Sequence, residues 1–496
     1  MPLTKQQVFA HAARGELKAP QWIAGFQGND DGLVNHTPID NSVIGRLGRG
    51  GQAEVDAAVR AARACFEAGE WRGKSPAERK AVMLAWCELL AVHAEELAAL
   101  DCIDAGKPID ECEQTDIPAS IDTVRWYAEA ADKVFGKVAP TAANATGLVI
   151  KEPIGVVAAV LPWNFPAQMY AWKVGPALAS GNSVIVKPAE LTPLSACRIT
   201  ELAHQAGIPA GALMVVNGRG EEAGAALGRH MDVDVVSFTG STDVGRLFLH
   251  YAAESNLKQV VLECGGKNPQ LVFADADLDA AVADILSAAF WNMGENCSCG
   301  SRLLVANEVK QALVDKLVAG LGDWTVGDPR QPGVRIGPMV ETAHFHKVRG
   351  YIERARADGL TCVAGGRVHE PFPGAGYVEP TIYLDVPPAH PLFREEVFGP
   401  LLAVTGFDSE AEAIRLANDT QYGLTASVYT ENIHRAQRVA RALRAGTVSV
   451  NGFSEGDITT PFGGYRQSGF GGRDNGLEAL DQYLETKTLW YVNRGD

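Results

Sequence analysis

The chain has 496 residues, of which 46% are hydrophobic and 21% charged, so it is long enough for two or three domains with large buried cores. Its 60 acidic and 44 basic residues give a formal net charge of −16, which argues against nucleic acid as a partner because phosphate binding needs a basic surface. No stretch has the roughly 18 uncharged apolar residues that cross a bilayer, and no signal peptide is evident, so we expect a cytoplasmic protein that binds no membrane. The nine cysteines are an odd number without a paired zinc-site spacing, so we expect reduced thiols and no metal.

Along the chain, helical periodicity comes first, over residues 79–100 and 125–134. From residue 156 onward, short apolar strands alternate with helices. We expect strands at 156–161, 183–186, 213–216 and 233–238, and helices at 172–179, 195–206 and 222–227. This alternation predicts a parallel sheet with helices on both faces, and ligands that bind at the carboxyl ends of its strands.

A second series of apolar strands is expected at 270–273, 302–305, 401–404, 427–429 and 448–450. Two series predict an α/β protein with two doubly wound parallel-sheet domains. We place the first domain at residues 1–130 and 151–265 and the second at 266–480. Residues 131–150 and 481–496 form a small third element, because alternating apolar residues such as Leu148 and Leu489 need a partner sheet.

One cysteine and one carboxylate stand out as candidate catalytic groups. Cys297 lies in Gly-Glu-Asn-Cys-Ser-Cys-Gly, and Glu263 lies among small residues in Leu-Glu-Cys-Gly-Gly-Lys. A free cysteine has a pKa of about 8.5, so a thiol nucleophile at neutral pH needs a base or a dipole beside it. The alternative is that Cys297 is an ordinary buried thiol.

Two glycine-rich segments are candidates for a phosphate-binding turn: residues 218–224 and 240–245. The second follows the apolar strand at 233–238 and opens a helix, so its backbone N–H groups and the positive helix end can meet a pyrophosphate. It is the better candidate, while the first alone reads as a loop.

Five further motifs occur in a fixed order around Glu263 and Cys297. They are Pro-Trp-Asn-Phe-Pro at 162–166, Lys-Pro-Ala-Glu at 187–190, Phe-Thr-Gly-Ser at 238–241, Glu-Glu-Val-Phe-Gly-Pro at 395–400 and Pro-Phe-Gly-Gly at 461–464. In this order they resemble the NAD(P)-dependent aldehyde dehydrogenase superfamily over essentially the whole chain. The tail from Gly456 to Asp474 resembles the group that acts on ω-amino, guanidino and γ-glutamylamino aldehydes of polyamine and arginine breakdown.

The resemblance assigns the first domain to the dinucleotide, the second to the nucleophile, and the third element to assembly into a dimer or tetramer. A carboxylate at the adenine-side ribose, Glu190 beside Lys187, favours NAD over NADP because it repels a 2′-phosphate. Glu396 and Phe398 would hold the nicotinamide ribose and ring. The remaining cofactor residues implied are Leu161, Pro162, Trp163, Gly220, Gly240, Ser241, Val244, Gly245 and Cys264.

The implied reaction oxidises an aldehyde to its acid. Cys297 attacks the carbonyl carbon, and Asn164 with the backbone N–H of Cys297 holds the oxyanion. Glu263 then activates water to hydrolyse the thioester. Asp474 falls where the family often has a glutamate that serves a proton relay.

For the substrate, the resemblance implies an aromatic tunnel of Phe165, Trp172 and Phe462. Asp457, with Glu455 and Asp116, is the candidate anion for an ammonium or guanidinium group. The alternatives are an aromatic aldehyde such as indole-3-acetaldehyde, or a broad range of aliphatic aldehydes. Rivals from other classes are a thioesterase or esterase, a non-catalytic NAD-binding protein and a CoA-acylating dehydrogenase.

Overall fold

A computed structural model describes residues 2–25 and 32–494. The first domain contains a six-stranded sheet in the order β20-β10-β9-β6-β7-β8. Its strands are β6 (Val156–Val160), β7 (Ser183–Lys187), β8 (Leu213–Val215), β9 (Val235–Thr239), β10 (Gln259–Glu263) and β20 (Gly469–Phe470). All neighbours are parallel except β20, which is antiparallel to β10.

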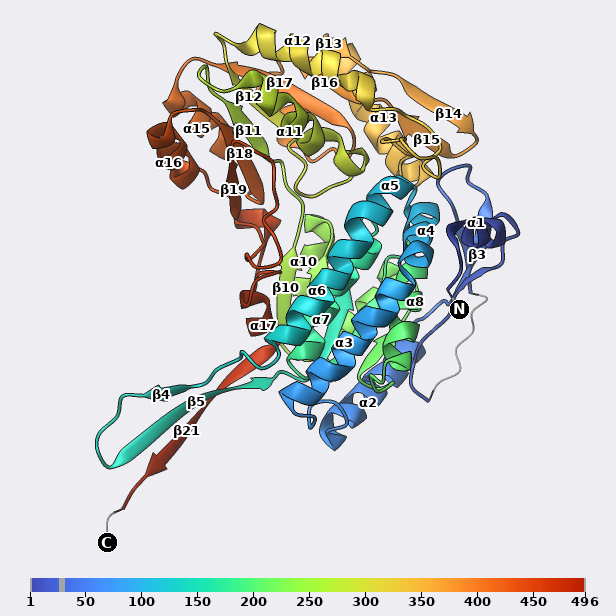
Figure 1. The fold of residues 1–496 in the computed structure, drawn as a ribbon, viewed down its shortest axis with the longest axis vertical. Coiled ribbons are helices and arrows are strands. Elements are labelled where there is room, and N and C mark those ends of the chain that lie inside the picture. The colour runs from blue at the N-terminus through green and yellow to red at the C-terminus, as the bar shows by residue number, and fades with distance from the viewer. Residues whose placement is uncertain (1, 26–31, 495–496) are drawn as a thin grey trace.

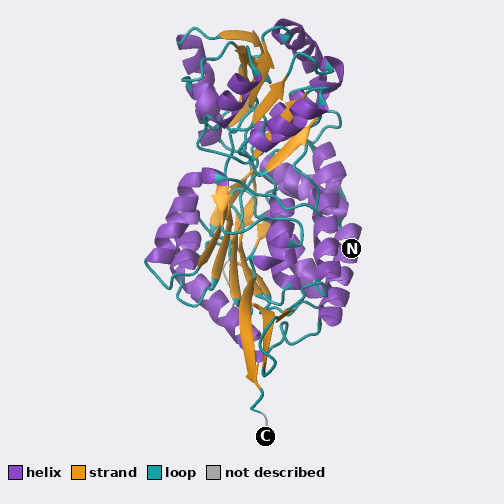
Figure 2. Cartoon of the chain, turned by 90° about the vertical axis from the view of Figure 1, so that its left-hand side faces the viewer, coloured by secondary structure: helices purple, strands orange, loops and turns teal. Residues whose placement is uncertain are grey.

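Helices cover this sheet on both faces, as Figure 2 shows. Alternate residues of β6 pack into different cores: Val157 and Ala159 into one, Val156 and Ala158 into the other. The first core is covered by α3 (Pro76–Val92), α4 (Ala94–Ala105), α6 (Ile117–Ala130), α7 (Pro166–Ala179) and α8 (Leu194–Gln205), and the second by α2 (Gln52–Ala68), α9 (Ala225–Arg229) and α10 (Thr242–Ala253). Because both faces are buried, the central residues of these strands are mostly apolar on both sides, as the sequence predicted.

The second large sheet has seven strands in the order β13-β16-β17-β12-β11-β18-β19. They are β11 (Pro269–Val272), β12 (Arg302–Ala306), β13 (Thr361–Ala364), β16 (Thr381–Leu384), β17 (Leu401–Phe407), β18 (Thr425–Tyr429) and β19 (Thr447–Val450). Only β13 runs antiparallel to its neighbour. The helices of this region are α11 (Leu278–Phe290), α12 (Lys310–Gly320), α13 (Thr342–Ala357), α14 (Pro391–Arg394), α15 (Glu410–Asn418) and α16 (Ile433–Ala442).

A three-stranded sheet, β21-β5-β4, projects from the body of the molecule (Figure 1). It joins β4 (Lys137–Ala139) and β5 (Ala145–Pro153) to β21 (Leu484–Val492), with Leu148 opposite Leu489. We call this sheet the arm. The predicted ranges 131–150 and 481–496 therefore pair with each other, although residues 495–496 lie outside the described residues, as do residues 1 and 26–31 of the predicted first domain.

The smaller elements complete the chain. They are α1 (Lys5–Ala13), β1 (Leu17–Ala19), β2 (Leu33–His36), β3 (Val43–Leu47), α5 (Ile109–Glu111), a π-helical turn (Cys112–Asp116), β14 (Val368–Phe372), β15 (Ala375–Val378) and α17 (Glu478–Asp481). The helix expected over 79–100 is two helices, because the backbone leaves helical geometry at His93, which ends α3 and begins α4. None of the described helices is long and apolar enough to cross a membrane.

Candidate active site

A cavity of about 180 Å³ lies between the two large sheets and brings together residues from both. Cys297, Glu263 and Asn164 all line it. It is also lined by the predicted residues Pro162, Trp163, Phe165, Trp172, Gly240, Ser241, Cys264, Glu396, Phe398 and Phe462. The sequence motifs that are far apart along the chain thus meet at one place.

Cys297 lies in the loop that leads from α11 into β12. Two hydrogen bonds from the side chain of Asn268 hold this loop. The Asn268 side chain donates to the carbonyls of Cys297 (2.8 Å) and Cys299 (3.0 Å). Burial, together with the negative charges of Glu455, Glu396 and Glu263, raises the pKa of the Cys297 thiol well above its ordinary value. The resting residue is therefore a thiol, and a base or a bound cofactor must favour its ionisation.

Asn164 is fixed so that one side-chain hydrogen stays available. Its Nδ2 donates one hydrogen bond to the Glu295 carbonyl (3.0 Å). The backbone carbonyl of Asn164 accepts hydrogen bonds from the Lys107 Nζ (3.0 Å) and from the Asn292 Nδ2 (3.2 Å). Because an amide nitrogen carries two hydrogens, the second can point toward a substrate oxygen in the cavity.

Glu263 ends strand β10 and is buried without a hydrogen-bond partner for either carboxylate oxygen among the described residues. Burial and the nearby negative charge of Asp474 raise its pKa well above the ordinary value, while Lys173 and Arg473 oppose this. Lys173 and Asp474 form a buried ion pair at 2.7 Å. A Cβ at Gly463 would lie 2.5 Å from Glu263 Oε1, so only glycine leaves room for the carboxylate.

Glu396, in the segment between α14 and β17, reaches two glycines just after the end of β10. Its Oε1 accepts a hydrogen bond from the Gly266 N–H (2.9 Å), and a Cβ on Gly265 would lie 2.0 Å from its Oε2. Burial raises the pKa of Glu396 to about 7. Phe398 packs edge-on against Trp163, with ring centroids 5.2 Å apart. This part of the cavity offers an aromatic wall and a carboxylate that accepts hydrogen bonds.

The other predicted cofactor residues lie outside this cavity, at or after the carboxyl ends of β6, β7, β8 and β9: Leu161, Lys187, Glu190, Gly220, Val244 and Gly245. Lys187 donates to Glu190 (2.8 Å). Burial works to raise the pKa of Glu190, but the Lys187 charge and the hydrogen bonds from Lys187 and the backbone together outweigh it, and the pKa is lowered. Helix α10 begins beside them, with Ser241 capping it through the Val244 N–H (3.3 Å).

Four aromatic and aliphatic side chains form the apolar side of the cavity. Phe165, Met169, Trp172 and Phe462 are buried together, and the Trp172 and Phe462 rings are 5.2 Å apart. Glu455 also lines the cavity and accepts a hydrogen bond from the Ser298 hydroxyl. Burial raises the pKa of Glu455.

Two of the predicted substrate residues lie elsewhere. Asp457 is exposed and accepts from the Thr459 N–H (2.7 Å), so it closes its own turn instead of facing the cavity. Asp116 is buried outside the cavity and is paired with Lys107 at 2.6 Å. The three predicted acids therefore do not lie together. Of the three, only Glu455 lines the active-site cavity, with its apolar side chains.

The family model that matches this chain is "Aldehyde dehydrogenase family", over residues 25–489. The chain belongs to this family. The aminoacetaldehyde dehydrogenase of Pseudomonas aeruginosa is 52% identical over 492 residues, covering 98% of each chain. A structure of γ-glutamyl-γ-aminobutyraldehyde dehydrogenase from Burkholderia cenocepacia has a TM-score of 0.95 at 48% identity and covers 99% of this chain and 100% of that one. The indole-3-acetaldehyde dehydrogenase AldA of P. syringae, in complex with NAD+, has a TM-score of 0.96 at 44% identity over 99% and 100%.

As an aldehyde dehydrogenase, the chain carries several site residues that sequence reasoning missed. Lys107, Asn268, Asn292 and Glu295 hold the loops of Asn164 and Cys297. Asn292 has a left-handed backbone (φ 51°) just before the catalytic loop. In the sequence these residues are polar side chains among apolar neighbours. That pattern alone does not distinguish a side chain that holds a catalytic loop in place from one that is simply exposed to solvent.

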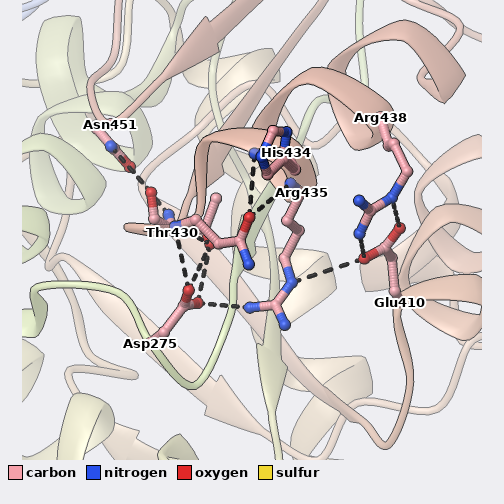
Figure 3. Close-up of polar contacts among 8 residues, drawn as sticks. Asp275, Glu410, Thr430, His434, Arg435, Arg438 and Asn451 are labelled. Atoms are coloured by element: carbon pink, nitrogen blue, oxygen red, sulfur yellow. Dashed lines mark hydrogen bonds and ion pairs between the residues drawn. The ribbon is translucent and has the colours of Figure 1, made fainter.

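The loop of residues 451–460, which carries Glu455, is anchored at its start (Figure 3). Asn451 exchanges two hydrogen bonds with the backbone of Thr430, at 2.9 and 3.0 Å. The Thr430 hydroxyl donates to Asp275, which also pairs with Arg435 at 2.6 Å. Within the described ranges, no group of three or more His, Cys, Asp or Glu side chains is arranged to hold a metal ion.

Proposed function

We propose that this aldehyde dehydrogenase oxidises ω-amino, guanidino or γ-glutamylamino aldehydes to their acids with NAD and water. The observation that supports the proposal most directly is the single cavity in which Cys297, Glu263 and Asn164 lie with an apolar passage and the carboxylate of Glu455. Relatives named for aminoacetaldehyde and for γ-glutamyl-γ-aminobutyraldehyde agree with this substrate class.

Cys297 Sγ adds to the aldehyde carbon and gives a thiohemiacetal. The developing oxyanion accepts hydrogen bonds from the free Nδ2 hydrogen of Asn164 and from the Cys297 N–H, each worth about 2.7–4 kcal/mol. Once the thioester has formed, Glu263 takes a proton from water, which attacks the acyl carbon and releases the acid from Cys297. We place the next acceptor of that proton at the buried Lys173–Asp474 pair, because Asp474 lines the cavity with Glu263.

The residues present fit NAD. Gly240 and the start of α10 offer backbone N–H groups to a pyrophosphate, Lys187 and Glu190 lie where an adenine-side ribose would bind, and Glu396 with Phe398 lines the nicotinamide end. When bound, NAD supplies the oxidation by accepting hydride from the carbon attached to Cys297. The negative charge of Glu190 favours NAD over NADP.

A second candidate substrate is an aromatic aldehyde. The wall of Phe165, Trp172 and Phe462 offers stacking surfaces, and AldA is an indole-3-acetaldehyde dehydrogenase. We favour the amino aldehydes because a buried carboxylate without a cationic partner beside the passage is costly unless a cation binds there.

Two broader features belong to the same proposal. We infer a dimer or tetramer, because Val138 and Trp490 on the arm are 74% and 59% exposed and need a partner surface. We also infer a cytoplasmic enzyme, since all nine cysteines are free and reduced thiols suit that compartment. A role in polyamine breakdown follows from the proposed substrate class.

The test of the substrate is a comparison of kcat/KM for 4-aminobutanal and butanal. A charge-assisted hydrogen bond is worth about 1.5–3 kcal/mol, so Glu455 should favour the amino aldehyde by roughly ten- to a hundredfold. Glu455→Gln should remove that preference, and the change for butanal should be much smaller because butanal carries no charge for Glu455 to bind. Asp457→Asn is the matched control, because this exposed acid lies outside the cavity and should have no effect.

Two results would contradict the assignment. Indole-3-acetaldehyde that outperforms every amino aldehyde in the wild type would favour the aromatic substrate. A preference for 4-aminobutanal that survives in Glu455→Gln would place the cation elsewhere. In both cases membership of the aldehyde dehydrogenase family stands.

A further inference from the structure

A second cavity, of about 550 Å³, lies beyond the active-site cavity. Trp291 and Phe453 line it, and the Trp291 ring lies 5.1 Å from the ring of Phe165, which lines the active-site cavity. The contact between Phe165 and Trp291 therefore joins the walls of the two spaces. We call this second space the outer cavity.

Two acids, Asp110 and Glu111, and one base, Arg335, line the outer cavity. Asp110 accepts a hydrogen bond from the Gly333 N–H (2.8 Å), and Glu111 and Arg335 do not pair with each other. One carboxylate oxygen of Glu111 is buried and has no hydrogen-bond partner within the part of the chain that the structure describes. The guanidinium of Arg335 stacks on the Trp324 ring, 3.7 Å from its centroid. Among the described residues, Arg335 has no carboxylate within ion-pair distance.

Glu111 forms no ion pair with a described residue, which leaves a place for a positively charged ligand. Burial raises the pKa of Glu111 to about 8, although the charges of Lys107 and Arg335 oppose the shift. Lys107 is already paired with Asp116 at 2.6 Å. An ammonium group in the outer cavity would stabilise the ionised carboxylate, because an opposite charge nearby favours the charged form.

We propose that the outer cavity binds the α-amino acid group at the far end of an extended aldehyde, with Glu111 facing its ammonium and Arg335 facing its carboxylate. A guanidinium presents a planar fork that matches a carboxylate. The methylene chain of such a substrate would pass between Trp291 and Phe453. The proposal rests on the proposed function and extends it, since a short ω-amino aldehyde would end at Glu455.

The test uses a γ-glutamylamino aldehyde, the analogue without its α-amino group, the analogue without its α-carboxylate, and propanal. In the wild type, each truncated analogue should lose roughly tenfold or more in kcat/KM relative to the full substrate. Arg335→Gln should lower the full substrate to the level of the analogue without the carboxylate, and Arg335→Lys should restore part of the loss. Glu111→Gln should act in the same way on the α-amino group. Propanal should be oxidised at the wild-type rate by all three variants.

Matched controls lie close by. Glu113→Gln removes an acid of the adjacent π-helical turn, where Glu113 pairs with Lys5. Arg349→Gln removes an arginine of α13 that pairs with Glu353. Neither residue lines the outer cavity, so both variants should keep the wild-type preference for the full substrate.

Several outcomes would overturn the proposal. Equal losses for propanal and the full substrate in Arg335→Gln would show a structural role for this arginine. No loss for the full substrate would show that its end lies elsewhere, and the proposed function would stand if Glu455→Gln still removed the preference for 4-aminobutanal. Tight inhibition by free L-glutamine, without any advantage of the full substrate over its analogues, would show a site for a free amino acid.

Discussion

At the scale of single residues, the state of Glu263 decides when the thioester can be hydrolysed. Burial and the Asp474 charge raise its pKa well above the ordinary value. A raised pKa means that the carboxyl is protonated at low pH and becomes a base only as the pH rises through that pKa. If hydrolysis limits turnover, kcat should therefore rise with pH along a limb that belongs to Glu263.

Asp474→Asn tests this interpretation directly. Removing a negative charge that raises the Glu263 pKa, while Lys173 keeps its positive charge, should move the rising limb of kcat to lower pH. The measurement is a pH profile of kcat from about pH 6 to 10 at saturating aldehyde and NAD. In Glu263→Gln the limb should be absent and turnover should fall by two or more orders of magnitude. A limb that stays in place in Asp474→Asn would mean that another group carries it.

Single residues also show how far the sequence could reach. Motif order placed Cys297, Glu263, Asn164 and Phe398, which all line the cavity. It did not tell Glu455 from Asp457, because only Gly456 separates them and the folded loop alone fixes which carboxylate faces inward. A periodic pattern determines which face a helix or strand buries, but an irregular loop has no period from which to read direction.

At the scale of elements, the loop of residues 451–460 depends on contacts far from the cavity. Asn451 has a left-handed backbone (φ 53°) and ties the loop to Thr430, which is held by Asp275 (Figure 3). Asp275 in turn pairs with Arg435, so the loop starts from a fixed polar network. The start of the loop that carries Glu455 is thus held by Thr430, just after β18, and by Arg435 of α16 through Asp275, which no local sequence pattern around residue 455 reveals.

Asn451→Ala should loosen this loop. The variant loses two hydrogen bonds worth about 1 kcal/mol each and places a Cβ residue without side-chain support in a left-handed conformation. We expect a several-fold higher KM for 4-aminobutanal with little change for butanal. Asn451→Gly is the matched comparison, because it keeps the backbone geometry while losing the same bonds. Equal KM increases for both aldehydes would show a general disturbance of the site.

Helices and strands could be predicted from the sequence where an element is buried on both faces. The strands of both large sheets are covered on two faces, so their sequences are uninterrupted apolar runs between helices. The break between α3 and α4 was not, because apolar residues continue on both sides of His93 and hide the change in backbone direction.

At the scale of the whole molecule, the arm is the feature that a single chain does not explain. Its β5 and β21 strands pair over their full length, yet Val138, Trp490, Tyr491 and Val492 stay largely exposed. A sheet that extends away from the body gains little from its own core, since a small sheet needs a packed face for stability. A second copy of the chain would bury these side chains.

Trp490→Asp together with Val492→Asp should therefore weaken assembly. Burying an unpaired charge opposes association, whereas the same charges on a free arm remain solvated. The measurement is the molar mass by light scattering after size-exclusion chromatography over a range of protein concentrations, beside kcat/KM for butanal. We expect a smaller assembly for the variant and near wild-type catalysis per chain, because the arm contributes no residue to the active-site cavity.

Leu257→Asp is the control, since this side chain is 80% exposed on the loop before β10 and lies away from the arm. An unchanged mass for the arm variant would mean that its apolar face stays in solvent or is covered by another part of the chain, and the inferred assembly through the arm would be wrong.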